Sequence, residues 1–514
     1  MIASMTRRPA WVLAVALCLL PAAALRARAA GPQAKVYVVL WFDTEDYLLP
    51  ADDDAALRLA TVLNRQDIRA TFKVVGEKAR TLERRGRGDV IAALKKHEIG
   101  YHANYHSVQP TPALYLSDLG WDDGVAEFDR RERPGYDDVR RIFGTIPTCY
   151  GQPGSSWGPQ SYGAIRNWGM KVYLDSGRHV GLEDRPCYYC GILNLYKLAY
   201  TLRANLKDPS RLPDAEDKFR AARQKLLAEG GGIVSICYHP CEFVHREFWD
   251  GVNFRHGANP PREKWQVPPA KSPAETKIAY QVFDDYIHFI KRFPEVRFIT
   301  ASQAARLYQD RAQGRKFTPA ELRAIAKGVK ENVSFQKKDG YALAAGEVFT
   351  LLNEYVAERS AGKDPSTVEL KGTPYGPSNP VAALSGPVHS DRSQLARTAA
   401  DVADFLARQG RIPTSVWLGS VAVPPEAYLN TLAQAAIDLV DGKPLPATIE
   451  VQPARLAVAA HVADDAPDLW RWVIFPPGFR APGMMRLAKR QAWTLKPAIL
   501  HPPANGPTSG PSPR

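Results

Sequence analysis

The sequence lacks features that would assign a nucleic-acid or membrane partner. Its 514 residues contain no basic stripe interleaved with aromatic side chains, which argues against nucleic acid as the partner. No membrane span is expected once the N-terminal segment described below is removed. The composition, 45% hydrophobic and 24% charged residues, is ordinary for a soluble globular protein and allows two or three domains.

Cysteine is also scarce, with six in the whole chain. Five of them follow the N-terminal segment, at positions 149, 187, 190, 237 and 241. An odd number excludes complete pairing into disulfides. The spacings Cys187-x-x-Cys190 and Cys237-x-x-x-Cys241 would also suit a structural zinc site, but in an exported protein we favour disulfides or buried thiols.

The N-terminus has the pattern of an export signal. Arg7 and Arg8 precede a mostly apolar run over residues 10–25, and Ala27-Arg28-Ala29 offers a small-x-small cleavage site. We therefore predict a signal peptide at residues 1–29 and a periplasmic or extracellular location; an uncleaved anchor is the alternative. The formal charge is +13, and four arginines belong to this segment, so the remaining chain carries about +9, which favours anionic envelope polymers or membrane surfaces.

From Lys35 the sequence alternates short apolar runs with helical stretches. This is typical of β/α units around a mostly parallel sheet, and we expect such an α/β domain over residues 35–310. Residues 36–42 predict a buried strand and residues 79–96 a helix. We expect the next helical segment to break at Pro134, because proline lacks the amide proton of a helix interior.

The chain changes character after a linker at residues 311–318. Apolar strand runs are missing, and amphipathic periodicity predicts a mostly α-helical accessory domain over residues 319–500. Residues 346–370 match residues 425–451, which indicates two related repeats. The Pro-, Gly- and Ser-rich residues 501–514 predict a disordered tail.

Two histidines four residues apart form the central motif of the first domain. On a turn of helix or in a tight loop, His102 and His106 point the same way, so their nitrogens could bind one divalent ion. A solvated or hydrogen-bonded pair would have the same spacing. The rest of the chain must decide between the two interpretations.

Carboxylates and a third imidazole follow other predicted strands. Asp43, Glu45 and Asp46 stand where the first strand gives way to its loop, the usual place for catalytic groups in a β/α barrel. Asp175 and His239 end two later strands. Taken singly, Asp175 could be a strand-end cap and His239 a core histidine.

In this order the motifs resemble the polysaccharide deacetylase, or NodB-homology, family. The likeness covers about residues 35–309 and implies a distorted (β/α) barrel. The segments that carry it are residues 42–46, 69–76, 97–107, 150–154, Asp175 and residues 236–239.

The resemblance implies roles for these residues. Asp43 would be the general base and His239 the general acid. His102, His106 and a carboxylate of the first motif would bind a divalent metal, most often zinc. In addition, Asp175 would orient or charge a catalytic imidazole.

Two departures from the family pattern affect these roles. Asp43 and Asp46 are separated by Thr44-Glu45 instead of being adjacent, so the metal carboxylate is Asp46 or Glu45, and we slightly favour the shorter Asp46. The arginine that should pair with the base is missing, since Gly151-Gln152 occupies its region. Without that cation we expect a raised pKa for Asp43.

The sequence thus predicts an exported metal-dependent hydrolase that removes N-acetyl groups from an acetylated polysaccharide. A catalytically impaired glycan-binding protein on the same scaffold is the main alternative, motivated by the missing arginine. A glycosidase that uses Asp43 and Asp46 as its carboxylate pair is a third, less favoured because the histidines suggest a metal. The repeats weakly resemble pseudomurein-binding modules and would then bind a cell-wall polymer; packing on the barrel or dimerisation carries equal weight.

Overall fold

The computed structural model describes residues 34–502. The predicted signal peptide and most of the predicted tail lie outside the described residues. Among the helices that are described, none combines the length and the apolar character needed to cross a bilayer.

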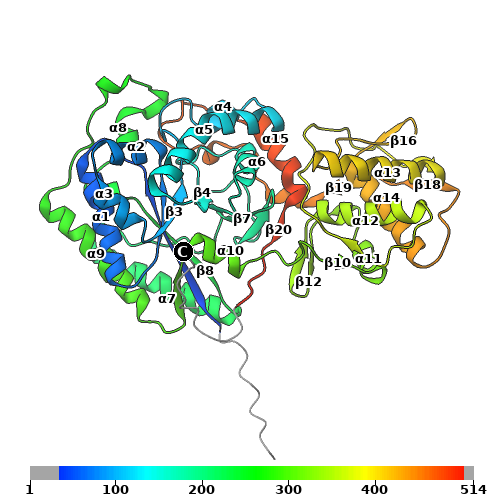
Figure 1. Cartoon of the computed structure of the whole chain (residues 1–514), viewed down its shortest axis with the longest axis horizontal. Helices are drawn as coiled ribbons and strands as arrows, with labels where there is room; N and C mark the ends of the chain where they lie inside the picture. Colours follow the sequence, from blue (N-terminus) through cyan, green and yellow to red (C-terminus); the bar gives the residue numbers. More distant parts are fainter. Residues whose placement is uncertain (1–33, 503–514) are drawn as a thin grey trace, which may run out of the picture. The chain divides into compact units, whose positions relative to one another are not determined.

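A ten-stranded sheet organises the first part of the chain (Figure 1). Its order is β20-β6-β7-β5-β4-β3-β2-β1-β8, and β9 also pairs with β1. The strands are β1 (Val36–Thr44), β2 (Thr71–Val74), β3 (Glu98–Tyr101), β4 (Cys149–Tyr150), β5 (Val172–Leu174), β6 (Cys187–Tyr189), β7 (Ile192–Leu195), β8 (Gly232–Tyr238), β9 (Val296–Ile299) and β20 (Lys496–Pro497).

Pairing is parallel from β8 to β7, and only β6 and β20 add antiparallel edges. All nine residues of β1 are buried, as a strand covered on both faces requires. The prediction of an α/β fold with a distorted (β/α) barrel is confirmed.

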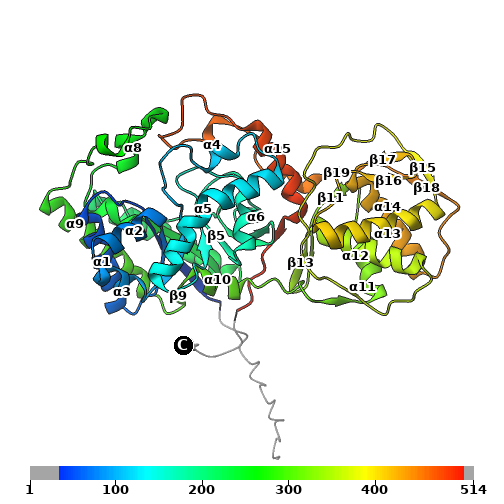
Figure 2. The ribbon, with the colours of Figure 1, turned by 45° about the horizontal axis from the view of Figure 1, so that its top comes forward.

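Helices surround this sheet (Figures 1 and 2). They are α1 (Pro50–Arg65), α2 (Gly76–Arg84), α3 (Gly88–Leu94), α4 (Pro112–Leu116), α5 (Trp121–Phe143), α6 (Gln160–Asn167), α7 (Leu212–Ala228), α8 (Trp249–Asn253), α9 (Pro273–Lys291), α10 (Ala301–Leu307) and α15 (Pro482–Arg490). The single helix predicted at residues 79–96 is divided into α2 and α3. Gly86 between them has φ +66°, a conformation that ends a helix and that glycine adopts without strain.

The predicted break at Pro134 is wrong, because α5 continues through it to Phe143. An interior proline costs a helix about 3 kcal/mol. Phe128, Tyr136 and Val139 of the same helix are buried in the main hydrophobic core. Burying these side chains offsets that cost, since each contributes roughly 1.5–3 kcal/mol.

Two units with the same order of elements follow the barrel. Each consists of a strand, a helix, a β-hairpin, a helix and a strand, and its first and last strands pair antiparallel. The first unit contains β10 (Lys316–Phe317), α11 (Pro319–Ala326), β12 (Gln336–Lys338), β13 (Tyr341–Leu343), α12 (Ala345–Ser360) and β14 (Val368–Glu369). The second contains β15 (Val388–Asp391), α13 (Arg392–Gln409), β16 (Val416–Leu418), β17 (Val421–Val423), α14 (Pro425–Val440) and β18 (Thr448–Val451).

This part has its own hydrophobic core, formed mostly by α11 to α14. The short strands were not expected from the sequence, because two- to four-residue strands give almost no periodic signal. A further short pair joins β11 (Asn332–Val333) to β19 (Arg455–Leu456). Whether these units bind a cell-wall polymer stays a prediction.

The last described segment returns to the barrel, although the sequence placed it in the accessory domain. Val458, Leu469, Phe475 and Met484 belong to the same hydrophobic core as the barrel strands, and β20 extends the main sheet through β6. Figures 1 and 2 show α15 beside the helices that cover this sheet. The return brings residues near 472 to the candidate site.

The five described cysteines are free thiols. Four are buried, and Cys237 is partly exposed in the pocket that holds the candidate site. Of the alternatives left open by the sequence, the structure contains buried thiols rather than disulfides within residues 34–502.

Candidate metal and catalytic site

The carboxyl ends of neighbouring parallel strands bring the predicted residues together. Asp43 lies in β1, His102 directly follows β3, and Asp175 and His239 directly follow β5 and β8. Because the strands are parallel, these ends meet at one edge of the sheet. Asp43, Glu45, His106, Asp175 and His239 accordingly line one pocket of about 590 Å³.

Glu45, His102 and His106 have the arrangement of a metal-binding triad. Glu45 Oε2 lies 3.4 Å from His102 Nε2 and 2.9 Å from His106 Nε2, and all three side chains are buried. Apart from this approach of Glu45, neither Nε2 atom has a hydrogen-bond partner among residues 34–502. Two imidazole nitrogens and a carboxylate oxygen suit a divalent ion such as zinc, so the residues present fit the metal that the sequence predicted.

The surroundings orient both imidazoles. His102 Nδ1 lies 2.9 Å from the carbonyl oxygen of Gly151, and donation of its proton leaves Nε2 free as a ligand. His106 Nδ1 lies 2.6 Å from Ser107 Oγ. His106 has φ 61°, a strained left-handed conformation for a non-glycine residue, and its Nε2 faces Glu45 at 2.9 Å.

The structure corrects our preference for Asp46 as the metal carboxylate. Successive side chains of an extended chain alternate in direction, so Glu45 points to the same side as Asp43 and Asp46 to the other. Asp46 instead lies with the buried Asp52 and His245, and its Oδ1 accepts a hydrogen bond from the Leu48 amide at 2.9 Å. The burial and the nearby Asp52 carboxylate raise its pKa well above the usual range.

Lys73 provides the cation that the missing arginine would have supplied. Its Nζ lies 2.9 Å from Asp43 Oδ1 and 2.7 Å from Asp175 Oδ2, and the side chain is completely buried. Burial raises the pKa of Asp43, but His102, Lys73 and His239 outweigh it, and the net pKa is lowered. The prediction that the pKa of Asp43 would be raised is therefore wrong. Sequence reasoning overlooked Lys73 because the residues of β2 have the pattern of an ordinary strand.

Asp175 contacts Lys73 rather than an imidazole. Its other oxygen accepts a hydrogen bond from the Ser176 amide at 2.7 Å. Burial raises the pKa of this carboxyl to about 6, and the Lys73 charge opposes the rise. Asp175 thus shares the Lys73 ammonium group with Asp43, and one of its carboxylate oxygens lies within 4.8 Å of a ring nitrogen of His102.

His239 has a partner of its own in Glu242, which the sequence did not single out. His239 Nδ1 lies 3.5 Å from Glu242 Oε1, and Nε2 faces Asp43 Oδ2 at 3.5 Å. Burial alone would lower the pKa of His239, but Glu45 and Glu242 raise it to about 9. Burial alone would raise the pKa of Glu242, but His239 and Arg203 lower it to about 2. The spacing His-x-x-Glu on the turn Pro240–Phe243 was the signal that could have identified Glu242.

Glu242→Gln should shift the alkaline limb of the activity profile to lower pH. The carboxylate raises the pKa of His239, so its removal lowers that pKa, and the protonated imidazole is lost at a lower pH. The measurement is kcat/KM against pH. Glu247→Gln, at an exposed carboxylate of the same pocket, is the control and should leave the limb in place.

The returning C-terminal segment completes the pocket. The Trp472 ring lies 5.2 Å from the His106 ring, and its indole Nε1 donates a 2.5 Å hydrogen bond to Asp250 Oδ2. Arg471 and Val473 line the same pocket. Sequence reasoning missed these residues because they lie more than 360 positions after His102 and His106.

No protein-family model and no curated protein sequence matches this chain. The neighbours among solved structures include polysaccharide deacetylases at low sequence identity, each matching about half of the chain. A Mycobacterium smegmatis protein assigned as a polysaccharide deacetylase is 15% identical with a TM-score of 0.36, and the match covers 54% of this chain and 90% of that one. A Pseudomonas aeruginosa PAO1 protein assigned likewise is 14% identical with a TM-score of 0.34, and the match covers 53% of this chain and 91% of that one. Puue allantoinase is 15% identical with a TM-score of 0.34, and the match covers 53% of this chain and 90% of that one.

Proposed function

We propose that this chain is an exported, metal-dependent hydrolase that removes N-acetyl groups from an envelope or extracellular polysaccharide. One observation carries the proposal: a buried Glu-His-His triad adjoins both a carboxylate with a lowered pKa and an imidazole with a raised pKa. Hydrolysis of an amide needs that combination of an electrophile site, a base and an acid.

Each residue has a role that follows from its surroundings. Glu45, His102 and His106 would hold the divalent metal, proposed to be zinc, which when bound polarises a carbonyl and acidifies water. Asp43 is ionised at neutral pH and accepts a proton from the attacking water. His239 is protonated at neutral pH and donates a proton to the departing amine. Lys73 fixes the Asp43 carboxylate through their 2.9 Å ion pair.

A catalytically impaired glycan-binding protein is the alternative function. The missing arginine motivated it, yet Lys73 occupies the corresponding electrostatic position beside Asp43. The geometry therefore favours the enzyme. The glycosidase alternative required Asp43 and Asp46 to face each other, but Asp46 is paired with Asp52 and His245 on another side of the loop.

The deciding experiment measures metal content and acetate release of the mature protein. Wild type should bind one divalent metal per chain and release acetate from acetylated chito-oligosaccharides or peptidoglycan, and His102→Ala should lose both. Metal binding without acetate release from either substrate would favour the binding protein. Absence of metal in the wild type would contradict the proposed mechanism.

Trp472→Ala should impair substrate binding while the metal stays bound. Trp472 lines the pocket beside His106, and loss of one aromatic contact to a bound sugar, worth about 1 kcal/mol, corresponds to a roughly fivefold rise in KM. Metal content should not change. Trp417→Ala, at a tryptophan 60% exposed in the β16–β17 hairpin, is the matched control. An unchanged KM would contradict a role for the returning segment in the pocket.

A further inference from the structure

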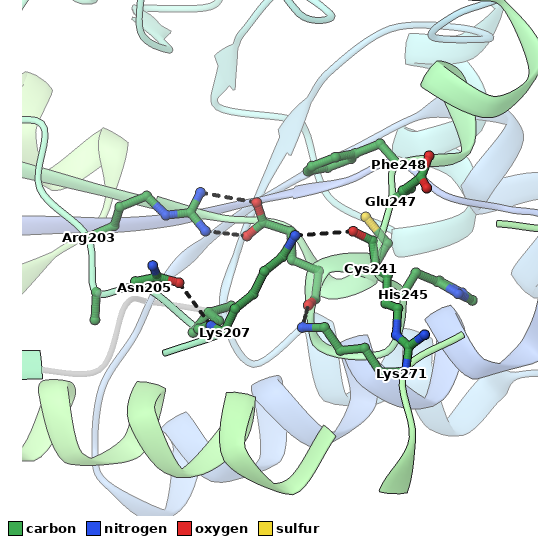
Figure 3. Close-up of a pocket in the computed structure, with 12 residues that line it drawn as sticks. Arg203, Asn205, Lys207, Cys241, His245, Glu247, Phe248 and Lys271 are labelled. Atoms are coloured by element: carbon green, nitrogen blue, oxygen red, sulfur yellow. Dashed lines mark hydrogen bonds and ion pairs between the residues drawn. The ribbon is translucent and has the colours of Figure 1, made fainter. Parts of the chain in front are cut away.

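A second cavity adjoins the candidate site, and apart from Glu242 its lining has no role in the proposed chemistry. It has a volume of about 380 Å³ and shares Glu247 and Phe248 with the pocket of the catalytic groups (Figure 3). The Phe248 ring meets the His239 ring edge-on at 4.9 Å. Glu247 and Phe248 thus belong to the walls of both cavities.

The charge of the second cavity is mainly positive. Its lining contains four basic and two acidic side chains, namely Arg203, Lys207, Arg246, Lys271, Glu242 and Glu247. Arg203 pairs with Glu242, and Arg246 pairs with Glu275 outside the cavity. Two of the four cations are thus neutralised by carboxylates.

Lys207 and Lys271 are the two cations that remain. Lys207 Nζ donates to the carbonyl oxygen of Arg246 at 3.2 Å, and Lys271 Nζ donates to that of Glu242. Neither forms an ion pair with a carboxylate in the described part of the chain. Burial and the neighbouring Lys207 charge lower the pKa of the half-buried Lys271, as expected for two ammonium groups that share a cavity.

The rest of the lining is suited to a sugar. Ala204, Leu206 and Phe248 provide apolar surface, and the amide of Asn205 adds a polar group. Figure 3 shows Lys207 extending across the cavity between Asn205 and the segment that carries Cys241 and His245. Apolar walls with a few convergent polar groups are typical of ligand sites.

A second pair of cations lies around the catalytic pocket itself. Arg255 and Arg471 line that pocket and are exposed, and neither forms an ion pair within residues 34–502. Basic side chains therefore line both of the pockets that share Phe248. An anionic chain that occupied both pockets would meet complementary charge in each.

We propose that the second cavity is an oxyanion subsite, and that the natural substrate is an acetylated glycan carrying carboxylate or phosphate groups. Lys207 and Lys271 bind the oxyanion of a sugar unit next to the one at His239, and Phe248 separates the two units. This inference rests on the proposed deacetylase function, because it places the scissile unit at His239.

The test is equilibrium binding of three N-acetylated oligosaccharides of equal length to the full mature protein at low salt. One is neutral, one carries carboxylates and one carries phosphates, so the two oxyanion sources are compared directly. Wild type should bind one anionic ligand at least about tenfold more tightly than the neutral one, and the preference should shrink as salt screens the charges. Lys207→Ala/Lys271→Ala should lose most of the preference, with Arg255 and Arg471 accounting for any remainder, while its affinity for the neutral ligand is unchanged.

Lys218→Ala, an exposed lysine of α7, is the matched control and should behave as wild type. Equal affinities for all three ligands, or a preference of the same size in the double variant, would overturn the subsite. Competition by inorganic phosphate alone, with no preference among the oligosaccharides, would overturn it as well. Binding needs no turnover, so a failure of deacetylation is detected separately by acetate release and metal content.

Discussion

Glu45→Gln is expected to abolish metal binding and acetate release, whereas Asp46→Asn should leave one metal per chain. Glu45 Oε2 is within 3.4 Å of both histidine Nε2 atoms, and an amide in its place loses the negative charge that a divalent ion requires. Loss of several kcal/mol of metal stabilisation corresponds to a fall in kcat/KM of at least about 10³-fold. Asp46 lies in a separate cluster with Asp52 and His245.

The two variants form a matched pair because each exchanges one buried carboxylate for an amide, at neighbouring positions. Metal content by elemental analysis is the first measurement, followed by acetate release. The unfolding temperature shows whether Asp46→Asn disturbs its own cluster without reaching the metal. If Asp46→Asn loses the metal and Glu45→Gln retains it, the assignment of the triad is wrong.

Lys73→Met should destabilise the fold by about 3–5 kcal/mol and remove most of the activity. The ammonium group is fully buried between Asp43 and Asp175, and both carboxylates keep the pKa of Lys73 raised despite its burial. Methionine fills a similar volume but leaves two buried carboxylates without their cation. One of them must then take up a proton, which also impairs Asp43 as a base.

A double-mutant cycle with Asp175→Asn separates the two effects. Removing Asp175 together with the lysine leaves only one carboxylate without its partner, so the double variant should recover part of the stability lost in Lys73→Met. Lys96→Met, at an exposed position before β3, is the control for loss of a lysine. Denaturant unfolding and acetate release are measured in parallel. A Lys73→Met protein as stable and active as wild type would show that the cation beside Asp43 is dispensable.

The sequence predicted the barrel because its signals are local. A run such as residues 36–42 is apolar throughout, and each of these residues is buried in β1. For the same reason, the histidine spacing and the acids at strand ends pointed to most of the residues that the structure gathers in the candidate site. The path of α5 through Pro134 could not be predicted, because the packing of Tyr136 and Val139 outweighs a local preference against proline.

The tertiary structure alone decided which groups meet. Beyond Thr44, the side chain of Glu45 rather than that of Asp46 lies beside His102 and His106. The pairing of β2 with β1 places Lys73 beside Asp43. The return of the chain after the repeats brings Trp472 to His106. The sequence determined the main barrel strands such as β1 and the chemical groups available, because propensity and hydrophobic period act over a few residues. The pKa values and the residues around the site depend on contacts between distant segments, and those exist only in the folded chain.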